Sequence, residues 1–382
     1  MEKLSRPVLA RNKTDAHRAA TELELLFDLV FVVAIALAAV GLHHAIAEAH
    51  YIDGIIKFLL AFFALWWPWN HFTWFASAFD NDDPSYRTSV MVMMFGALMI
   101  AGSMPAFFES MDFRLMAIGY VILRLAYVFL WYRAGKANPD YKVTAQRYIW
   151  GQVLIQIGWL ASAFLLPHDS VYIFIGFGIG VLLELFIPYY ANKAKTMPWH
   201  KHHIVERYGL LNIIVLGEIL LSAALALQSM SKSGHWSLDI ILIAVCATIV
   251  PFTLWWLYFC EEENLQSEEP DHVFLWGYGH YIIFASAAAI GAGFAALIDA
   301  SGAHPHGDPV AALWVITTSI FLYVFGLWFI RDRHVLHIKA ASVLLIFSVL
   351  ILLSPLFPVI TLPLATGLLV TVLVFRINGR RI

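Results

Sequence analysis

Twelve long hydrophobic stretches follow one another along this chain, and short polar segments separate them. They lie near residues 25–46, 55–79, 87–108, 113–133, 146–166, 171–191, 206–226, 237–259, 272–297, 310–330, 338–357 and 359–376. A helix that crosses the hydrocarbon core of a bilayer needs roughly 20 apolar residues, and each stretch comes close to that length. The pattern therefore predicts an all-α polytopic membrane protein with about twelve transmembrane helices.

The composition supports this class and excludes others. Of the 382 residues, 60% are hydrophobic and 13% are charged, whereas soluble domains carry about 25% charged residues. The net charge is −3 and there are two cysteines, so the chain has neither a dense basic face for nucleic acid nor a disulfide framework. The polar first 20 residues and the length of the first apolar stretch argue against a cleavable signal peptide.

Lysine and arginine residues are distributed unevenly between the two ends of the predicted helices. With the N-terminus in the cytoplasm, all but four of the 24 basic residues fall on the cytoplasmic side. The exceptions are Lys57, Arg114 and Lys232 on the outer side, and Arg124 within a predicted helix. Because cytoplasmic loops carry an excess of Lys and Arg, we expect both termini in the cytoplasm, and an even number of helices agrees.

The two halves of the chain resemble each other. Residues 22–39 align with 206–223, and further matches follow in the same order, such as Tyr127-Val128-Phe129 with Tyr323-Val324-Phe325. Six helices in each half would give the halves one orientation, which predicts parallel repeats about an axis along the membrane normal. The predicted organisation is a cytoplasmic N-terminal segment (1–20), a first six-helix repeat (21–191), a cytoplasmic linker (192–205) and a second six-helix repeat (206–382).

Ionisable side chains inside the hydrocarbon are rare and costly, and they indicate function or a buried ion pair. Arg124 lies near the middle of the fourth predicted helix and needs a carboxylate partner. Glu218, Glu184 and Asp28 are the candidates, and depth in the bilayer favours Glu218. His280 lies at a similar depth. Such a pair either fixes the register of two helices or serves transport or gating, and the sequence leaves both interpretations open.

Other polar and aromatic groups have structural interpretations. Thr21 and Glu24 fit a capping box that opens the first helix. Glu206 and Arg207 fit an ion pair at the membrane interface. Residues 200–203 fit a basic segment that flanks the helix on the cytoplasmic side. The tryptophans of Trp66-Trp67-Pro68-Trp69 fit an interfacial aromatic belt. Pro68 removes a backbone hydrogen bond, so Asn70 and His71 after it mark a candidate kink toward a polar cavity.

No sequence motif indicates catalysis or a cofactor. The chain lacks a phosphate-binding loop, a nucleophile elbow, a zinc-protease motif and a dinucleotide fingerprint, so we expect no enzyme, no cofactor and no metal. His44 with Glu48, and the loop His304-Pro305-His306-Gly307-Asp308, are interpreted as solvated groups. Zinc binding and pH sensing by these histidines stay open as alternatives.

Several motifs in a fixed order carry a resemblance to a known family. They are Arg18-x-x-Thr21-Glu22-Leu23-x-x-Leu26-Phe27-Asp28-Leu29-Val30-Phe31, Trp66-Trp67-x-Trp69, Phe79-Asp80-x-Asp82-Asp83, Tyr120-x-x-x-Arg124-Leu125, His203-x-Val205-Glu206-Arg207-Tyr208-Gly209-Leu210, Ile214-Val215-Leu216-Gly217-Glu218, Trp255-Trp256-x-Tyr258-Phe259 and Gly277-Tyr278-Gly279-His280. This set resembles the bacterial low temperature requirement A (LtrA) family. The resemblance implies a bacterial inner-membrane protein linked to growth in the cold, and it implies no molecular activity.

Three functions remain in competition at this stage. A secondary transporter or permease for a small solute or ion is favoured, with Asp28, Arg124, Glu184, Glu218, His280 and Asn212 as candidate path residues. The alternative is a cation channel lined by the first and seventh helices. The sequence at the start of the first helix partly resembles that of two-times-six-helix potassium channels. Its apolar constrictions would be Ile35 and Ile219. The third is a non-transporting membrane-organising protein. The expected partners are the lipid bilayer and the solute or ion, with a homodimer left open.

Overall fold

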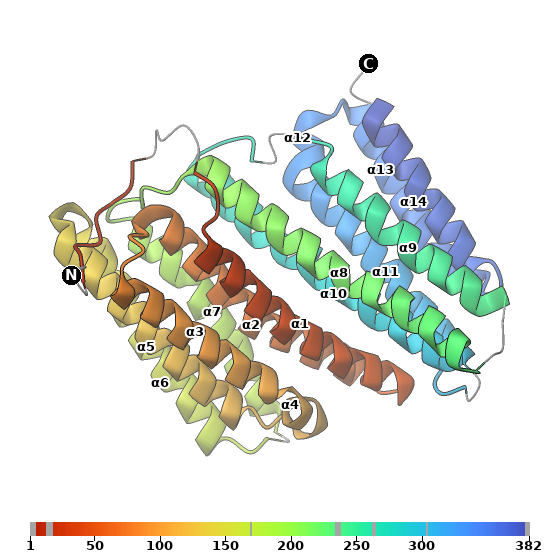
Figure 1. Ribbon diagram of the computed structural model, residues 1–382, viewed down its shortest axis with the longest axis horizontal. Coiled ribbons are helices and arrows are strands. Elements are labelled where there is room, and N and C mark those ends of the chain that lie inside the picture. Colours follow the sequence, from red (N-terminus) through yellow and green to blue (C-terminus); the bar gives the residue numbers. More distant parts are fainter. Residues whose placement is uncertain are drawn as a thin grey trace. The chain divides into compact units, whose positions relative to one another are not determined.

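A computed structural model describes residues 5–12, 18–168, 170–233, 238–261, 265–302 and 305–378, and these residues fold into helices and connecting segments without a β-strand (Figure 1). His304 lies outside this part of the chain, and so do His235 and four of the 24 basic residues counted above: Lys3, Lys13, Arg380 and Arg381. The side chains of Lys232 and Lys339 also lie outside the description.

The helices follow the predicted hydrophobic stretches. The first half contains α1 (Glu22–Ala47), α2 (Tyr51–Phe79), α3 (Pro84–Gly102), α4 (Met104–Ser110), α5 (Arg114–Ala137), α6 (Lys142–Leu165) and α7 (Val171–Asn192). The second half contains α8 (Lys201–Ser233), α9 (Leu238–Phe259), α10 (Pro270–Ser301), α11 (Pro309–Leu327), α12 (Arg333–Val335), α13 (Ile338–Leu353) and α14 (Thr361–Asn378). Helix α4 continues the span that α3 begins, and a π-helical turn over Trp328–Asp332 joins α11 to α12.

The prediction of an all-helical polytopic membrane protein is confirmed. Eleven helices of the described chain are long and apolar enough to cross a membrane, and the twelfth stretch forms a shorter apolar helix over Ala340–Leu356. The largest difference from the predicted boundaries is at α8, predicted over 206–226 and found over Lys201–Ser233. This helix extends beyond the apolar stretch at both ends, because each further residue adds one backbone hydrogen bond to a helix that has already formed.

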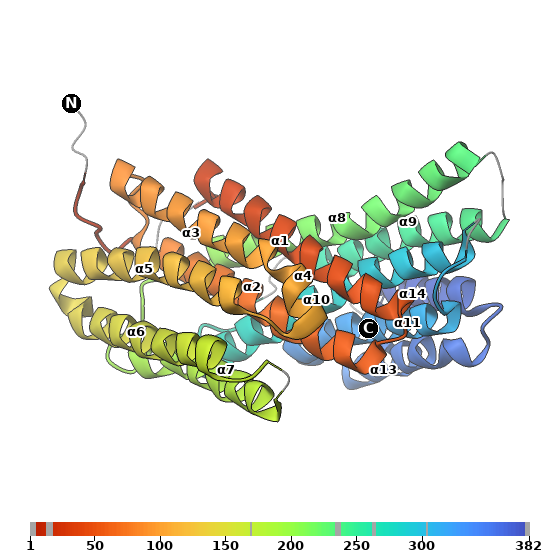
Figure 2. The ribbon, with the colours of Figure 1, turned by 90° about the horizontal axis from the view of Figure 1, so that it is seen from below.

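The chain divides into two compact units, and each is described by itself. The first unit comprises Met1–Ala38 and Leu60–Arg207, and the second comprises Ala39–Leu59 and Tyr208–Ile382. In the first unit α3 packs on α5, and α5, α6 and α7 follow one another (Figure 2). Gly96 and Gly119 permit the α3–α5 contact, because a Cβ atom on Gly96 would lie 2.6 Å from the Gly119 carbonyl oxygen.

The second unit is built around the packing of α10 on α11. Small residues again permit the approach: a Cβ atom on Gly293 would lie 2.7 Å from Ile316, and one on Gly326 would lie 2.7 Å from Ile283. Helix α13 packs on α11 and α14, and α14 packs on α9. Burial of apolar surface gives little net attraction between helices in lipid, so close van der Waals contact of this kind holds such helices together.

The segment before α1 is tied to one end of the first unit by backbone hydrogen bonds. The Arg11 N–H donates to the Ala78 carbonyl over 2.9 Å, and the Ala10 N–H donates to the Asn138 side chain over 2.8 Å. The Arg6 N–H donates to Asp83 over 2.6 Å, and Asp83 also caps α3 by accepting from the Tyr86 N–H. These contacts place Arg18 at the start of α1, beside the charged residues described next.

Candidate functional site

Two buried clusters of polar side chains lie within the first unit, and the first surrounds Arg207. Its guanidinium makes a forked contact with Asp28, with nitrogen–oxygen distances of 2.6 and 3.1 Å, and lies 2.9 Å from a Glu24 oxygen. His203 lies 3.0 Å from the same Glu24 oxygen, and the Trp69 indole N–H donates to Asp28 over 2.7 Å. Asp28, Arg207 and His203 are fully buried. We call this group the Arg207 cluster.

Arg18 and Asp80 extend the Arg207 cluster toward the end of α2. Arg18 donates to the carbonyls of Ala76 and Ser77 at the C-terminal end of that helix, where unpaired carbonyls favour a cation. It also lies 3.6 Å from Asp80 and 3.8 Å from Glu24. Burial raises the pKa of Asp80, and the nearby Glu24 carboxylate raises it further, while Arg18 and Arg11 lower it in part. Burial disfavours the charged form of Arg18 as well, and for a cation this lowers the pKa.

The Arg207 cluster confirms one sequence prediction and corrects two. The capping box is present, because Glu24 accepts from the Thr21 N–H over 2.8 Å and the Glu24 N–H donates to the Thr21 hydroxyl. Asp28 faces protein rather than lipid. However, Arg207 pairs with Asp28 and Glu24 and not with its neighbour Glu206, which accepts from the Ala20 N–H. Residues 200–203 are no simple basic flank either, since His203 is buried against Glu24.

The second buried group surrounds the ion pair of Arg124 with Glu184, and we call it the Glu184 cluster. Arg124 donates to Glu184 over 2.9 Å, and both side chains are almost fully buried. The Trp67 indole N–H donates to the same Glu184 oxygen over 2.9 Å, and Trp159 approaches the other oxygen at 3.4 Å. His71 Nδ1 lies 2.8 Å from Arg124 and 3.2 Å from the Gln152 amide nitrogen.

The prediction that Arg124 pairs with a carboxylate is thereby confirmed, but the choice of Glu218 was wrong. Equal depth made Glu218 the favoured partner, yet the ion pair is formed with Glu184 of α7. Depth along a helix follows from the sequence, whereas the identity of the neighbouring helix depends on packing. Within the first unit α5 packs on α6 and α6 on α7, and this places Arg124 and Glu184 together.

Several polar atoms of the Glu184 cluster have no hydrogen-bond partner within the described structure. They are His71 Nε2, Arg124 Nε and Gln152 Oε1, and one turn further along α6 both amide atoms of Gln156 also have none. Gln152 and Gln156 lie four residues apart on α6, so they share one face of the helix, and both are buried. Buried polar groups without partners are uncommon and require an explanation, such as a bound polar molecule. The Gln152–Gln156 spacing is the sequence signal that we missed.

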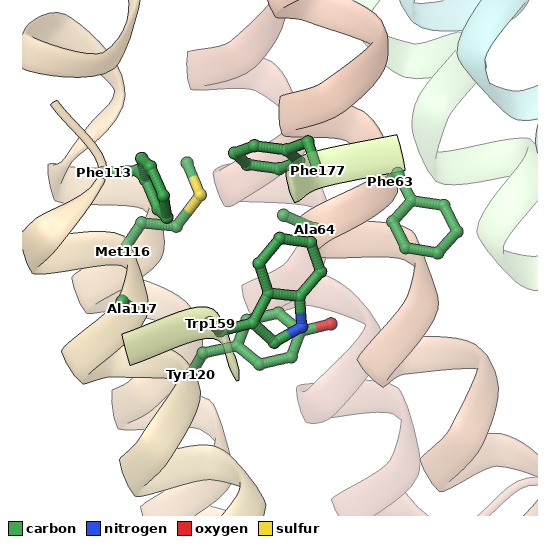
Figure 3. A pocket seen from close by; sticks show the side chains of 8 residues that line it. All are labelled: Phe63, Ala64, Phe113, Met116, Ala117, Tyr120, Trp159 and Phe177. Carbon is green, nitrogen blue, oxygen red and sulfur yellow. The ribbon is translucent and has the colours of Figure 1, made fainter. Parts of the chain in front are cut away.

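A small apolar cavity adjoins the Glu184 cluster. Its volume is about 20 Å³, which is enough for about one water molecule. The lining consists of Phe63, Ala64, Phe113, Met116, Ala117, Tyr120, Trp159 and Phe177, whose side chains surround a common space (Figure 3). Two of these belong to both features: Tyr120 receives a hydrogen bond from Arg124 over 3.3 Å, and Trp159 contacts Glu184. The cavity therefore lies next to the ion pair, with these two side chains between them.

The sequence predicts an interfacial aromatic belt for the tryptophans of residues 66–69, and this prediction is wrong. Trp66, Trp67 and Trp69 are buried in the first unit, where Trp67 donates to Glu184 and Trp69 donates to Asp28. Helix α2 thus contributes one indole N–H to each buried cluster. The candidate kink at Pro68 does face polar groups, because His71 contacts Arg124.

The remaining candidates of the sequence analysis lie in the second unit, except for Ile35. His280 lies 3.0 Å from the Tyr258 hydroxyl and 2.8 Å from the Trp276 carbonyl. Asn212 accepts from the Tyr323 hydroxyl over 2.9 Å. Glu218 is half-buried on α8. Ile35 of the first unit and Ile219 of the second are both fully buried. In the part of the chain that is described, no group of three or more His, Cys, Asp or Glu residues could hold a metal ion.

Comparison with known proteins identifies the family. The family model for the bacterial low temperature requirement A protein (LtrA) matches residues 19–377. The chain belongs to the LtrA family. A similar protein is the uncharacterized protein RA0937 of Rhizobium meliloti (strain 1021), 24% identical over 288 residues, or 71% of this chain and 68% of the relative. No solved structure matches. Of the LtrA motifs quoted above, those containing Asp28 and Arg207 meet in the Arg207 cluster.

Proposed function

We propose that this LtrA-family protein is a secondary transporter for a small solute or ion in the bacterial inner membrane. In this proposal both termini lie in the cytoplasm, and the helices form two parallel six-helix repeats. The protein carries out no chemical conversion. Movement of the solute is coupled to a change in the charge of buried side chains, and the Glu184 cluster is the place where the two meet.

The observation that carries this proposal is the incomplete hydrogen bonding of the Glu184 cluster. In the Arg207 cluster, the atoms of Glu24 and Arg207 that lack a hydrogen bond face each other as an ion pair. His203 Nε2 lies against the same Glu24 oxygen, which leaves only His203 Nδ1 without a partner in this cluster of the described chain. In the Glu184 cluster, by contrast, a buried ion pair lies beside polar atoms of His71, Arg124 and Gln152 that have no partner in the described chain. The buried amide of Gln156, one turn further along α6, adds two more such atoms. Leaving such atoms unpaired costs about 1–3 kcal/mol each. A solute that supplies both donors and acceptors would recover that cost.

The chemistry of the cluster suits a solute with an anionic group. Arg124 has an unused Nε–H, and a guanidinium can present two parallel donors to a carboxylate or phosphate. An anion on Arg124 would compete with Glu184, and uptake of a proton by Glu184 would remove that competition. The cavity of about 20 Å³ holds no more than about one water molecule, so this conformation is closed and transport requires the helices to separate.

Packing within each unit supports the two repeats. The third helix of each half packs on the fourth (α3 on α5, α10 on α11), and the fifth packs on the sixth (α6 on α7, α13 on α14). The matched residues Tyr127 and Tyr323 make the same kind of contact. Each hydroxyl donates to a carbonyl of the second helix of its half, Tyr127 to His71 over 3.0 Å and Tyr323 to Leu254 over 3.5 Å.

The cation channel receives less support from the structure. A pore lined by α1 and α8 would use Asp28 and Asn212 to attract cations. Asp28 is instead neutralised by Arg207 at 2.6 Å and also accepts from Trp69, and the Asn212 oxygen accepts from Tyr323. The membrane-organising role predicts that the Arg124–Glu184 pair is purely structural, and the following experiment separates it from transport.

The experiment measures flux through purified protein in liposomes, with potassium, chloride, phosphate and acetate as probes at two external pH values. Glu184→Gln keeps the shape of the side chain and can still accept from Trp67, but it cannot change its charge. We expect it to reduce flux strongly while the protein still folds, because the amide cannot take up the proton that frees Arg124 for the solute. Glu109→Gln, on the exposed end of α4, is the matched control and should leave flux unchanged.

The double variant Arg124→Met with Glu184→Gln distinguishes transport from architecture. Removing both charges avoids an unpaired buried ion, which alone costs about 3–5 kcal/mol. We expect stability to return and flux to stay lost. Restored stability together with restored flux would assign the pair to architecture and overturn the proposal, as would full flux through Glu184→Gln.

A further inference from the structure

A groove runs between α6 and α7 in the first unit, and Trp159 is the residue that it shares with the Glu184 cluster. Its volume is about 630 Å³, which lies in the range of sites that bind small molecules. The lining residues come from these two helices alone, and most of them are apolar or small. The two helices lie side by side and each is long and apolar enough to span the membrane (Figure 2).

The charge of the groove is one-sided. Arg147 is its single ionised residue, and no acidic side chain lines it. The guanidinium donates to the Tyr190 carbonyl over 2.9 Å and lies over the Tyr190 ring at 4.5 Å. Within the described chain it forms no ion pair with a carboxylate, so its charge is available. Gln146 and Trp150, close to Arg147 in sequence, also line the groove. Aromatic residues beside a cation are typical of the lipid headgroup level.

Small residues line the rest of the groove: Gly180 and Gly151 lie against the side chains of Trp159 and Ile187, and Gly158 leaves open space. Gly151, Gly158, Gly176 and Gly180 are among its lining residues. A Cβ atom on Gly158 would meet nothing within 4 Å, so the groove is open at that position. The neighbouring Leu154 is 65% exposed. A flexible hydrocarbon chain is the shape that fills a long, narrow and apolar space of this kind without leaving polar atoms unpaired.

We propose that the α6–α7 groove binds one anionic phospholipid, with its phosphate group on Arg147 and an acyl chain along the glycine-lined part. The single cation at one end selects the charge of the headgroup, and the apolar remainder selects the chain. The cytoplasmic end of α6 would carry Arg147 in the proposed orientation, and that leaflet is the one rich in anionic lipid. The site does not depend on whether the protein transports a solute.

Trp159 gives this site a connection to the interior. Its side chain lines the groove and also the small cavity beside the Glu184 cluster. It packs against Gly180 and approaches Glu184 with its indole nitrogen. An acyl chain in the groove would therefore contact a residue that also lines the cavity.

The test is native mass spectrometry of the purified protein, incubated with phosphatidylglycerol or phosphatidylcholine of the same acyl chains. We expect the protein to retain one phosphatidylglycerol molecule in preference to phosphatidylcholine. Arg147→Gln should weaken that preference about fivefold, the typical effect of one basic residue at a membrane surface. Lys193→Gln is the matched control, because Lys193 lies near the same helix end over the Tyr189 ring but does not line the groove.

A second pair of variants tests the acyl-chain part independently of charge. Gly158→Leu places a side chain in the groove from a position whose Cβ would meet nothing within 4 Å, and it should abolish retention of both lipids. Gly178→Leu is matched to it, because Gly178 also has open space around it but lies outside the groove. Equal retention of the two lipids by the wild type would overturn the proposal, and so would retention unaffected by Arg147→Gln and Gly158→Leu. A change of oligomeric mass in Gly158→Leu would instead assign the groove to a second copy of the chain.

Discussion

Replacing Arg207 by glutamine should destabilise the protein far more than the same loss of charge at its neighbour Glu206. Arg207 makes three nitrogen–oxygen contacts of 2.6–3.1 Å with Asp28 and Glu24. All three side chains are buried. Glu206 is half-buried, and its side chain accepts one hydrogen bond, from the Ala20 N–H over 3.2 Å. The two neighbours thus differ in burial and in the number of contacts that a substitution removes.

The magnitude follows from what each substitution leaves behind. Arg207→Gln leaves two buried carboxylates without their cation, and breaking a buried ion pair costs about 3–5 kcal/mol. The cost should not double, because Glu24 keeps His203 at 3.0 Å and Asp28 keeps the Trp69 N–H at 2.7 Å. Glu206→Gln retains an amide oxygen that can accept from Ala20, so its cost should be about 1 kcal/mol or less.

Equilibrium unfolding by SDS in mixed micelles, followed by helical ellipticity, gives the free energy of unfolding for each variant. Combining Asp28→Asn with Arg207→Gln completes a double-mutant cycle, and the combined cost should be clearly smaller than the sum of the single costs. Arg207→Lys should fall between the wild type and Arg207→Gln, because lysine restores the charge without the fork. A cost for Glu206→Gln as large as that for Arg207→Gln, or strictly additive costs in the cycle, would refute the pairing described here.

Two further predictions concern the segment between α2 and α3 and the packing of the first unit. Asp83→Asn should cost about 2–3 kcal/mol because Arg133 loses a charged partner, whereas Asp82→Asn removes an exposed pair and should cost less than about 1 kcal/mol. Burial works to raise the pKa of Asp83, but hydrogen bonds from Arg133 and two backbone N–H groups outweigh it and lower that pKa. Asp83 therefore makes its full contribution to stability above the ordinary aspartate pKa of about 4, and this contribution is lost as the pH falls below that value. Between pH 6 and pH 3 the melting temperature of Asp83→Asn should decline less than that of the wild type. Gly96→Ala should cost about 1–3 kcal/mol through overpacking, while Gly102→Ala, which meets nothing within 4 Å, should be neutral or stabilising in the same unfolding assay; equal effects of the two would contradict the close α3–α5 contact.

The sequence by itself determined the fold class and the family. Apolar stretches of about 20 residues can satisfy their backbone hydrogen bonds in a membrane only as helices, so the length and spacing of the stretches predicted each helical segment. Local signals were equally reliable. The capping box of Thr21 and Glu24 depends on residues three positions apart, and such contacts do not require knowledge of any other helix.

Only the tertiary structure decided which polar groups meet. Glu218 and Glu184 were both plausible partners for Arg124 by depth, and Arg207 had an acidic neighbour in sequence. The choice of Glu184 depended on the packing of α5, α6 and α7, and the choice of Asp28 depended on α1 lying beside the start of α8. Residues 66–69 show the same limit, because a tryptophan pattern is identical whether the indoles face an interface or a buried carboxylate. Hydrophobicity fixes the position of a residue along the membrane normal, whereas close packing of helices fixes its neighbours, and a single sequence records the first far more directly than the second.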